Sequence, residues 1–96
     1  MRVRWTHRSL RSLDEITDHI ARERPAAART VAERIFAAID RLGKHPASGR
    51  PGRVSGTREL VVPGTPFIVP YRVRDEVVEV LHVFHGARRW PDDFPG

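Results

Sequence analysis

The sequence contains no cysteine, a single lysine (Lys44) and no long apolar run. The lack of cysteine excludes disulfide bonds and thiolate chemistry. No stretch approaches the roughly 18 apolar residues that a membrane-spanning helix needs. The opening MRVRWTHRSL also lacks the apolar core of a secretory signal. We therefore expect a cytoplasmic protein that makes no contact with a membrane.

What the sequence does contain is a globular composition with an excess of arginine. Its 96 residues predict a single domain over 1–96, with 40% hydrophobic and 30% charged residues. The formal net charge is +5. Such a charge favours an anionic partner, either nucleic acid or an acidic protein segment. A basic surface that is merely solvated would give the same value, so charge alone does not decide.

The first half of the chain predicts one strand and two helices. RVRW (2–5) alternates arginine with apolar residues, as a strand does, and helices are expected over Ser9–Arg24 and Pro25–Leu42. Pro25 can end the first helix and open the second. The short connection makes the two helices an antiparallel hairpin. Their apolar stripes are Leu10, Leu13, Ile16 and Ile20 in the first helix, and Ala28, Val31, Ile35, Ile39 and Leu42 in the second.

The second half predicts strands. After a loop rich in proline and glycine (44–56), the apolar period changes from 3.6 to 2, with strands expected over 57–62, 67–73 and 77–85. Short turns between them indicate an antiparallel meander. The order β-α-α-β-β-β predicts an α+β fold, with a helical hairpin packed on one face of a small antiparallel sheet.

Two positions within these strands need comment. Pro70 removes a ladder hydrogen bond, so we expect a bulge or a local loss of pairing there. In a regular last strand, His82 and His85 point to opposite faces and do not share a metal ion. We interpret His82 as a core histidine. Neither a metal site nor an organic cofactor is indicated.

The stretch VEVLHVFHGARRWP (78–91) ends the last strand in a polar cluster. One interpretation is structural, with Trp90 packing back on the sheet and the arginines paired to Asp75, Asp92 or Asp93. The other is an anion-facing corner, because guanidinium groups donate paired hydrogen bonds to phosphate and carboxylate. The residues expected in that corner are His85, Arg88, Arg89 and Trp90, with Arg72 and Arg58 nearby. Glu59 is interpreted as an exposed strand residue rather than a general base.

The element order and several motifs resemble the RelE/ParE superfamily of type II toxin–antitoxin toxins. The motifs are HPASGRPGR, TRELVV, YRV and VEVLHVFHGARRWP, spread over nearly the whole chain. The resemblance implies a toxin that arrests growth, neutralised by an antitoxin that wraps across the helices and the sheet. It also implies that operator DNA is contacted only through the antitoxin. The residues expected to bind the antitoxin are Leu13, Ile16, Ile20, Val31 and Ile35.

Within that superfamily the motifs favour the ParE-like branch, which inhibits DNA gyrase. YRV (71–73) and the spacing of His85 and Arg88 match ParE-like toxins, whereas Ile68 stands where RelE-like toxins commonly carry an arginine. Arg89 and Trp90 depart from the residues usual in ParE-like toxins. This reading assigns no catalytic residue, and target binding to His85, Arg88, Arg89, Trp90 and Arg72.

Two other functions remain open. The chain could be a RelE-like, ribosome-dependent mRNA endonuclease, with His85 as acid or base and Arg58, Arg72 and Arg88 holding phosphate. It could also be a degenerate toxin fold that serves only as an antitoxin partner or as a corepressor on DNA.

Overall fold

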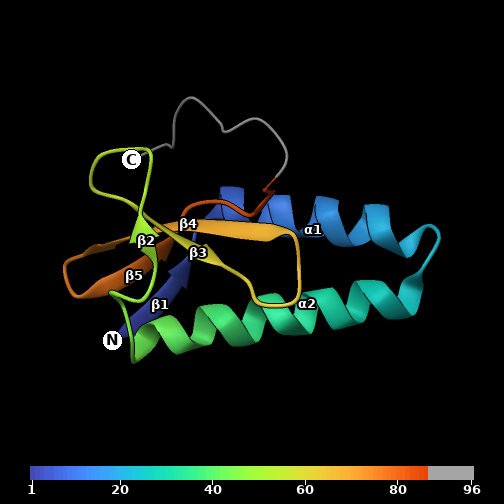
Figure 1. The fold of residues 1–96 in the computed structure, drawn as a ribbon, viewed down its shortest axis with the longest axis horizontal. Coiled ribbons are helices and arrows are strands. Elements are labelled where there is room, and N and C mark those ends of the chain that lie inside the picture. The colour runs from blue at the N-terminus through green and yellow to red at the C-terminus, as the bar shows by residue number, and fades with distance from the viewer. Residues whose placement is uncertain (87–96) are drawn as a thin grey trace.

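The computed structural model describes residues 1–86, and in it two helices cover one face of a mixed sheet (Figure 1). The helices are α1 (His7–Ala21) and α2 (Pro25–Asp40), followed by a 3-10 turn, η1 (Arg41–Gly43). The strands are β1 (Arg2–Trp5), β2 (Arg50–Pro51), β3 (Arg58–Val61), β4 (Phe67–Arg74), β5 (Val77–Val80) and β6 (Phe84–His85). No helix within residues 1–86 is long and apolar enough to cross a membrane. The α+β fold is confirmed.

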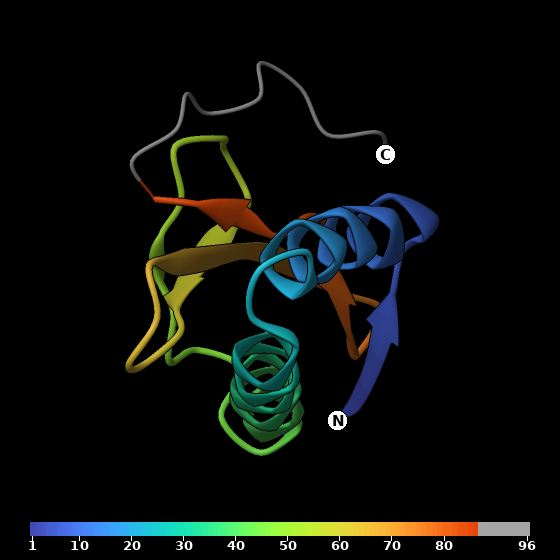
Figure 2. The same ribbon diagram turned by 90° about the vertical axis from the view of Figure 1, so that its right-hand side faces the viewer.

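The helical hairpin forms as its sequence predicts, but α1 begins and ends earlier than expected and α2 ends two residues earlier. The hydroxyl of Thr6 caps α1 by accepting from the amide of Ser9 at 3.2 Å, so α1 begins before the expected Ser9. Pro25 occupies the first turn of α2, as predicted. In Figure 2, α1 and α2 lie one above the other beside the sheet.

The sheet is mixed, not purely antiparallel as expected. Its order is β1-β5-β4-β3-β2, with β6 beside β4. The chain of β2, β3, β4 and β5 pairs antiparallel, but β1 runs parallel to β5, with Arg2 opposite Val77 and Trp5 opposite Val80. β5 lies inside the sheet, between β1 and β4. The two-residue strand β2, inside the expected loop, was not predicted.

The core lies between the helices and one face of the sheet. Side chains alternate along β4: Phe67, Val69 and Tyr71 face the helices, while Arg72 and Arg74 face the other side, which we call the open face. The fully buried side chains of Ile35 and Ile39 in α2 pack on this core. Burying side chains of this kind contributes about 1.5–3 kcal/mol each.

Pro70 divides the last strand but leaves its own strand intact. On the β3 side β4 pairs without a break, and Pro70 lies opposite Glu59. On the other side β5 ends at Val80 and β6 begins at Phe84, so two residues of β4 face three residues of the partner. The Pro70 carbonyl accepts from the amide of Leu81 at 2.9 Å. Because the nitrogen and the carbonyl of a strand residue face the same neighbour, the Pro70 nitrogen, which carries no hydrogen, also faces this gap. The expected bulge is confirmed, and the single strand expected over 77–85 is wrong.

The β4–β5 turn is strained, and this predicts a gain in stability from two substitutions. Asp75 and Glu76 both have positive φ, 54° and 59°, which favours Asn-Gly at these positions. We expect Asp75→Asn with Glu76→Gly to raise the free energy of unfolding by about 1 kcal/mol in urea denaturation. Gly56→Ala is the matched control, because Gly56 also has positive φ (80°) and should lose about 1 kcal/mol. Equal stability of all three proteins would contradict the strain.

Candidate functional site

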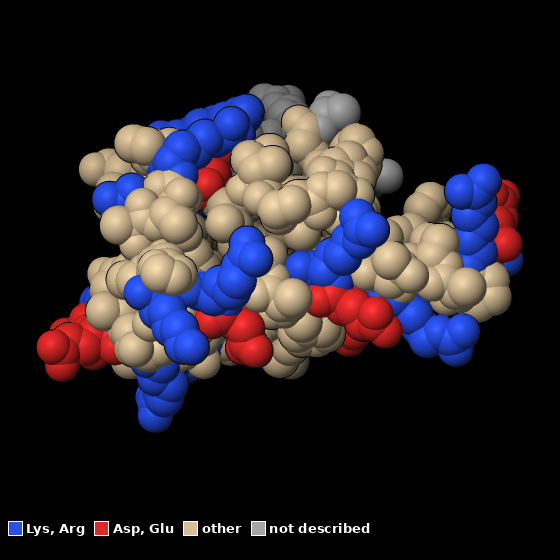
Figure 3. Space-filling view, turned by 60° about the horizontal axis from the view of Figure 1, so that its bottom comes forward, with Lys and Arg blue, Asp and Glu red and all other residues tan. Residues whose placement is uncertain are grey.

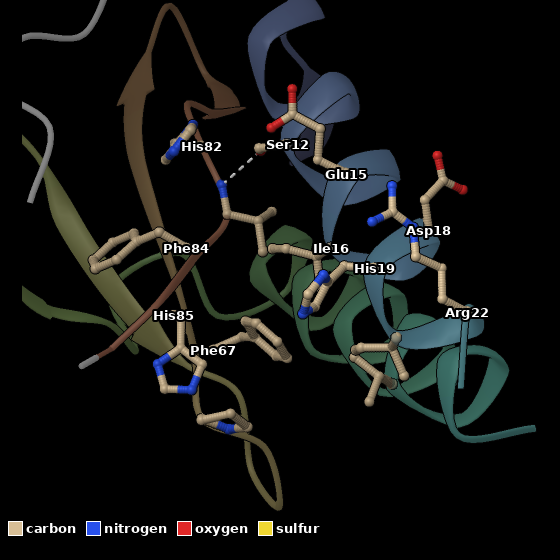
Figure 4. A pocket seen from close by; sticks show the side chains of 14 residues that line it. Ser12, Glu15, Ile16, Asp18, His19, Arg22, Phe67, His82, Phe84 and His85 are labelled. Carbon is tan, nitrogen blue, oxygen red and sulfur yellow. Dashed lines mark hydrogen bonds between the residues drawn. The ribbon is translucent and has the colours of Figure 1, made fainter. Parts of the chain in front are cut away.

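The site at the end of the last strand is a groove between α1 and the strands β4 and β6 (Figure 4). Its volume is about 890 Å³. Apolar side chains come from both walls: Ile16, Ile20, Val31, Phe67, Val83 and Phe84. Polar side chains also line it: Glu15, Asp18 and His19 on α1, Arg22 just after α1, and His82 and His85 on the strand side. A groove of this kind suits an amphipathic segment better than a small polar substrate.

Ser12 holds the strand side of the groove in place. Val83 lies in the bulge opposite Pro70 and has no strand partner for its amide, which donates to the Ser12 hydroxyl at 3.0 Å. The Ser12 hydroxyl donates in turn to the carbonyl of Ser9 at 2.9 Å. Both serines are buried, so this chain of hydrogen bonds ties the bulge to α1. Sequence reasoning missed Ser12, although a serine one position before the buried Leu13 was a visible signal.

The two late histidines face the same groove because of the bulge. The ring of His85 meets Phe67 edge-on, with centroids 5.6 Å apart, and the ring of His82 stacks on Phe84 at 6.3 Å. His82 is half-buried, rather than a fully enclosed core histidine. Burial lowers its pKa, as does the charge of Arg8, while Glu15 opposes the shift. The neutral form of the His82 ring is therefore favoured more strongly than in a free histidine.

His19 adds a third imidazole from the opposite wall, but these residues do not make a metal site. In Figure 4, His19 projects from α1 and His85 from the strand side. Within residues 1–86, no three histidine, aspartate or glutamate side chains gather closely enough to hold a metal ion.

The arginines expected beside His85 lie elsewhere. His85 pairs with Phe67, so it faces the helices, whereas Arg72 faces the open side and lies five residues along β4, roughly 16 Å away. Arg58 pairs with Tyr71 and donates to the carbonyl of Gly49 at 2.8 Å. The structure therefore does not bring His85, Arg72 and Arg58 together. Arg88, Arg89 and Trp90, and the suggested partners Asp92 and Asp93, lie outside the described residues.

Arg72 belongs instead to an ionic cluster on the open face, centred on Glu79. The Glu79 carboxylate contacts Arg4, Arg72 (2.8 Å) and Arg74 (3.3 Å), and its side chain is only 5% exposed. Burial by itself raises the pKa of Glu79. The hydrogen bonds from Arg72 and Arg4, with the charges of Arg74 and Arg72, outweigh that effect and lower the pKa below its usual value. Sequence reasoning did not single out Glu79.

Glu59 and Tyr71 fix the loop that precedes β3. Glu59 is buried, which corrects its interpretation as an exposed residue: it accepts from Arg50 at 3.0 Å and from the amide of Arg53 at 3.0 Å. The hydroxyl of Tyr71 donates to the Pro46 carbonyl at 2.7 Å and accepts from the amide of Gly49 at 2.9 Å. These contacts explain Glu59 as a structural residue rather than a general base.

The residues expected to bind an antitoxin divide by burial. Leu13 and Ile35 are 5% and 0% exposed and belong to the core, so they present almost no area to a partner in this conformation. Ile16, Ile20 and Val31 are partly buried and line the groove. A partner in the groove would therefore meet the latter three.

Comparison with known proteins identifies the family. Residues 3–90 match the family model described as the ParE toxin of the type II toxin–antitoxin system parDE. The chain belongs to the ParE toxin family. Its fold is similar to a chain of the chromosomal ParDE system of P. aeruginosa, with a TM-score of 0.81 and 28% identity over 88% of this chain and 95% of that one.

The proteins similar to this chain include RelE-named as well as ParE-named members of the superfamily. This ParE-family chain is 51% identical over 90 residues to the toxin candidate Y4kP of Sinorhizobium fredii, covering 94% of this chain and 93% of that protein. It is 36% identical over 86 residues to toxin RelE2 of Caulobacter vibrioides, covering 90% and 96%. A chain of the RelBE2 toxin–antitoxin complex of Mycobacterium tuberculosis is 31% identical with a TM-score of 0.58, covering 88% and 95%. Membership in the toxin superfamily is thereby confirmed.

The Glu79 cluster of this ParE-family protein predicts acid sensitivity. Because the folded-state pKa is lowered, its stabilising contribution is complete above the unfolded value of about 4.3 and is lost as pH falls through the folded pKa. We expect Glu79→Gln to lower the free energy of unfolding by about 2 kcal/mol at pH 7 and to flatten its dependence on pH below about 5. Urea denaturation between pH 3 and 7 measures both effects. Glu33→Gln, an exposed position on α2, should change neither.

The hydrogen bond of Ser12 gives a second prediction. Ser12→Ala leaves the amide of Val83 without its acceptor, so we expect a loss of about 1–3 kcal/mol in the free energy of unfolding. Hydrogen exchange of that amide should also become faster. Thr30→Ala is the control, because Thr30 also bonds a helical carbonyl but is exposed on α2. An unchanged Val83 amide in Ser12→Ala would show that Ser12 does not hold the bulge.

Proposed function

We propose that this protein arrests growth by inhibiting DNA gyrase and that a cognate antitoxin neutralises it by occupying the groove beside α1. The observation that carries the choice of target is the separation of the residues that a nuclease would need. His85 faces the helices while Arg72 faces the open side, where Glu79 engages it. General acid–base cleavage of a phosphodiester needs these groups on one phosphate.

The family supports the same reading of the target. The chain matches a ParE toxin model over residues 3–90, and the ParDE chain has a higher TM-score than the RelBE2 chain, 0.81 against 0.58. The resemblance of YRV and of the His85–Arg88 spacing to gyrase-inhibiting toxins points in the same direction. Under this proposal His85, Arg88, Arg89 and Trp90 contact the target and no residue is catalytic. Arg72 is withdrawn from that contact set because it lies on the other face.

For the antitoxin, the groove offers apolar walls and a rim of both charges. Ile16, Ile20 and Val31 would meet the apolar side of an amphipathic segment, with Glu15, Asp18 and Arg22 at its polar edge. The ParDE and RelBE2 structures compared above come from toxin–antitoxin systems. We propose that operator DNA is reached only through this antitoxin, and that the protein works in the cytoplasm without a cofactor.

The alternative is a ribosome-dependent mRNA endonuclease. It is favoured by the 36% identity to toxin RelE2 and by the RelBE2 structure. This alternative gives His85 the role of acid or base, with Arg58, Arg72 and Arg88 on phosphate. It requires the described arginines to leave their present partners, the carbonyl of Gly49 and the carboxylate of Glu79.

A gyrase supercoiling assay tests the proposal. We expect purified toxin to inhibit supercoiling, to trap cleaved DNA and to lose both effects when antitoxin is added. Arg88→Ala and Arg89→Ala should each require about tenfold more toxin, because arginines often dominate an interface. Arg29→Ala is the matched control, since Arg29 is exposed on α2 and does not belong to the residues proposed to contact the target.

Two outcomes would contradict the gyrase reading. A preparation that arrests growth without inhibiting gyrase would support the nuclease, and His85→Ala should then abolish cleavage of translated mRNA while antitoxin binding persists. Expression without growth arrest would support a degenerate toxin that serves as an antitoxin partner or corepressor.

A further inference from the structure

A second pocket lies where α2 ends and the loop toward β2 begins. Its volume is about 340 Å³. The lining residues come from four parts of the chain: Ala38 of α2, Arg41 of η1, His45 and Ser48 of the following loop, and Leu60 of β3. None of them lines the groove beside α1, so the two cavities are separate. A cavity of this size, near the lower end of the roughly 300–1,000 Å³ range of ligand pockets, suits one small molecule.

Hydrogen bonds fix the loop that forms one wall of this pocket. The carbonyl of Arg41 accepts from the amide of His45 at 2.9 Å, and the carbonyl of His45 accepts from the amide of Ser48 at 3.1 Å. The next amide, that of Gly49, donates to the hydroxyl of the buried Tyr71 at 2.9 Å. The backbone of the three polar lining residues is therefore held in place without the use of their side chains.

The polar side chains of the pocket are available to a ligand. Within residues 1–86, the side chains of Arg41, His45 and Ser48 make no hydrogen bond and no ion pair. By contrast, four other arginines bind the two buried carboxylates of the sheet. Asp40 directly precedes Arg41, and adjacent residues of a helical turn do not face each other. The pocket thus offers a guanidinium, an imidazole and a hydroxyl to whatever enters it.

These three groups fit the terminal oxygens of a phosphate. A guanidinium donates two parallel hydrogen bonds, and an imidazole N–H and a hydroxyl can each donate one more. A phosphomonoester has three terminal oxygens and a higher charge than a carboxylate, which has two, so it uses this set of donors more fully. The side chains of Ala38 and Leu60 are apolar and give the rest of the ligand an uncharged surface. The pocket therefore suits a phosphate group that is attached to a small, largely apolar body.

The surroundings of the pocket favour a small ligand over a long polyanion. On the α2 side of the molecule, which Figure 3 brings forward, basic side chains are spread out and several lie beside acidic ones. A surface that binds nucleic acid gathers its basic side chains in a patch or a stripe. The attraction for an anion is therefore local to the pocket.

We propose that this pocket binds a small phosphomonoester of the mononucleotide type. The guanidinium of Arg41 holds two oxygens of the phosphate, while His45 and Ser48 bind the third. The ring of the ligand rests on Ala38 and Leu60. The site is distinct from the groove, and its ligand is neither the target nor the antitoxin of the proposed function.

The test is a titration of the isotope-labelled full chain with adenosine 5′-monophosphate, followed by NMR. We expect saturable shifts of the amide signals of Arg41, His45, Ser48 and Leu60, with half-saturation at or below about 1 mM. Adenosine lacks the phosphate and should not bind. Inorganic phosphate lacks the ring and its apolar contacts, so it should bind at least about tenfold more weakly.

Variants of the lining residues test the role of each group. Arg41→Gln should weaken the binding of adenosine 5′-monophosphate at least about tenfold, because it removes charge-assisted hydrogen bonds. Ser48→Ala removes one hydroxyl and should weaken binding by a smaller factor. Arg29→Gln is the matched control, since Arg29 is exposed on α2 and its loss of the same charge should leave binding unchanged. Arg41 is also exposed, so its variant should keep the amide spectrum of a folded protein.

Three results would overturn the proposal. The first is the absence of shifts at the lining residues at about 10 mM adenosine 5′-monophosphate, well above the expected half-saturation. The second is equal affinity for this nucleotide and for inorganic phosphate, which would make the pocket a site for any anion. The third is equal binding by the folded Arg41→Gln variant and by the unaltered chain.

Discussion

The missing N–H of Pro70 is the constraint on which the site depends. Proline stands within β4 but turns its nitrogen away from β3, so the ladder with β3 survives and the partner on the other side must change. The last strand responds with an extra residue between β5 and β6, and Ser12 on α1 supplies the hydrogen bond that the sheet does not. The bulge then brings His82 and His85 to the same groove instead of opposite faces.

The sheet separates two kinds of chemistry. The helix face carries an apolar groove with imidazole rings, which suits an amphipathic protein segment. The open face carries three arginines around the buried carboxylate of Glu79, which neutralises part of their positive charge. A high net charge therefore says little about where anions bind, because burial and pairing decide which guanidinium groups are available.

Much of this architecture could be predicted from local signals. Helical periodicity, Pro25 and the change to period 2 predicted both helices and most of the strands. The parallel pairing of β1 could not be predicted, because nothing in RVRW specifies a partner 75 positions away. Glu59 was misread because alternation predicts a face, while burial depends on Arg50 from a loop that folds over it. The position of Ser12 beside Leu13 was visible in the sequence, but its partner, the amide of Val83, could not be predicted from local signals.

The same parallel pairing fixes the order in which the molecule can be completed. The residues of β1 are made before those of β5, so β1 finds its partner only when β5, 75 positions later in the sequence, has left the ribosome. The helical hairpin is local and can form early, but its apolar faces wait for strands that arrive later. A nascent chain that stops before Val77 lacks the strand that joins β1 to β4. Assembly of the sheet is thus a late event in synthesis, and a truncated chain should never display the finished surfaces.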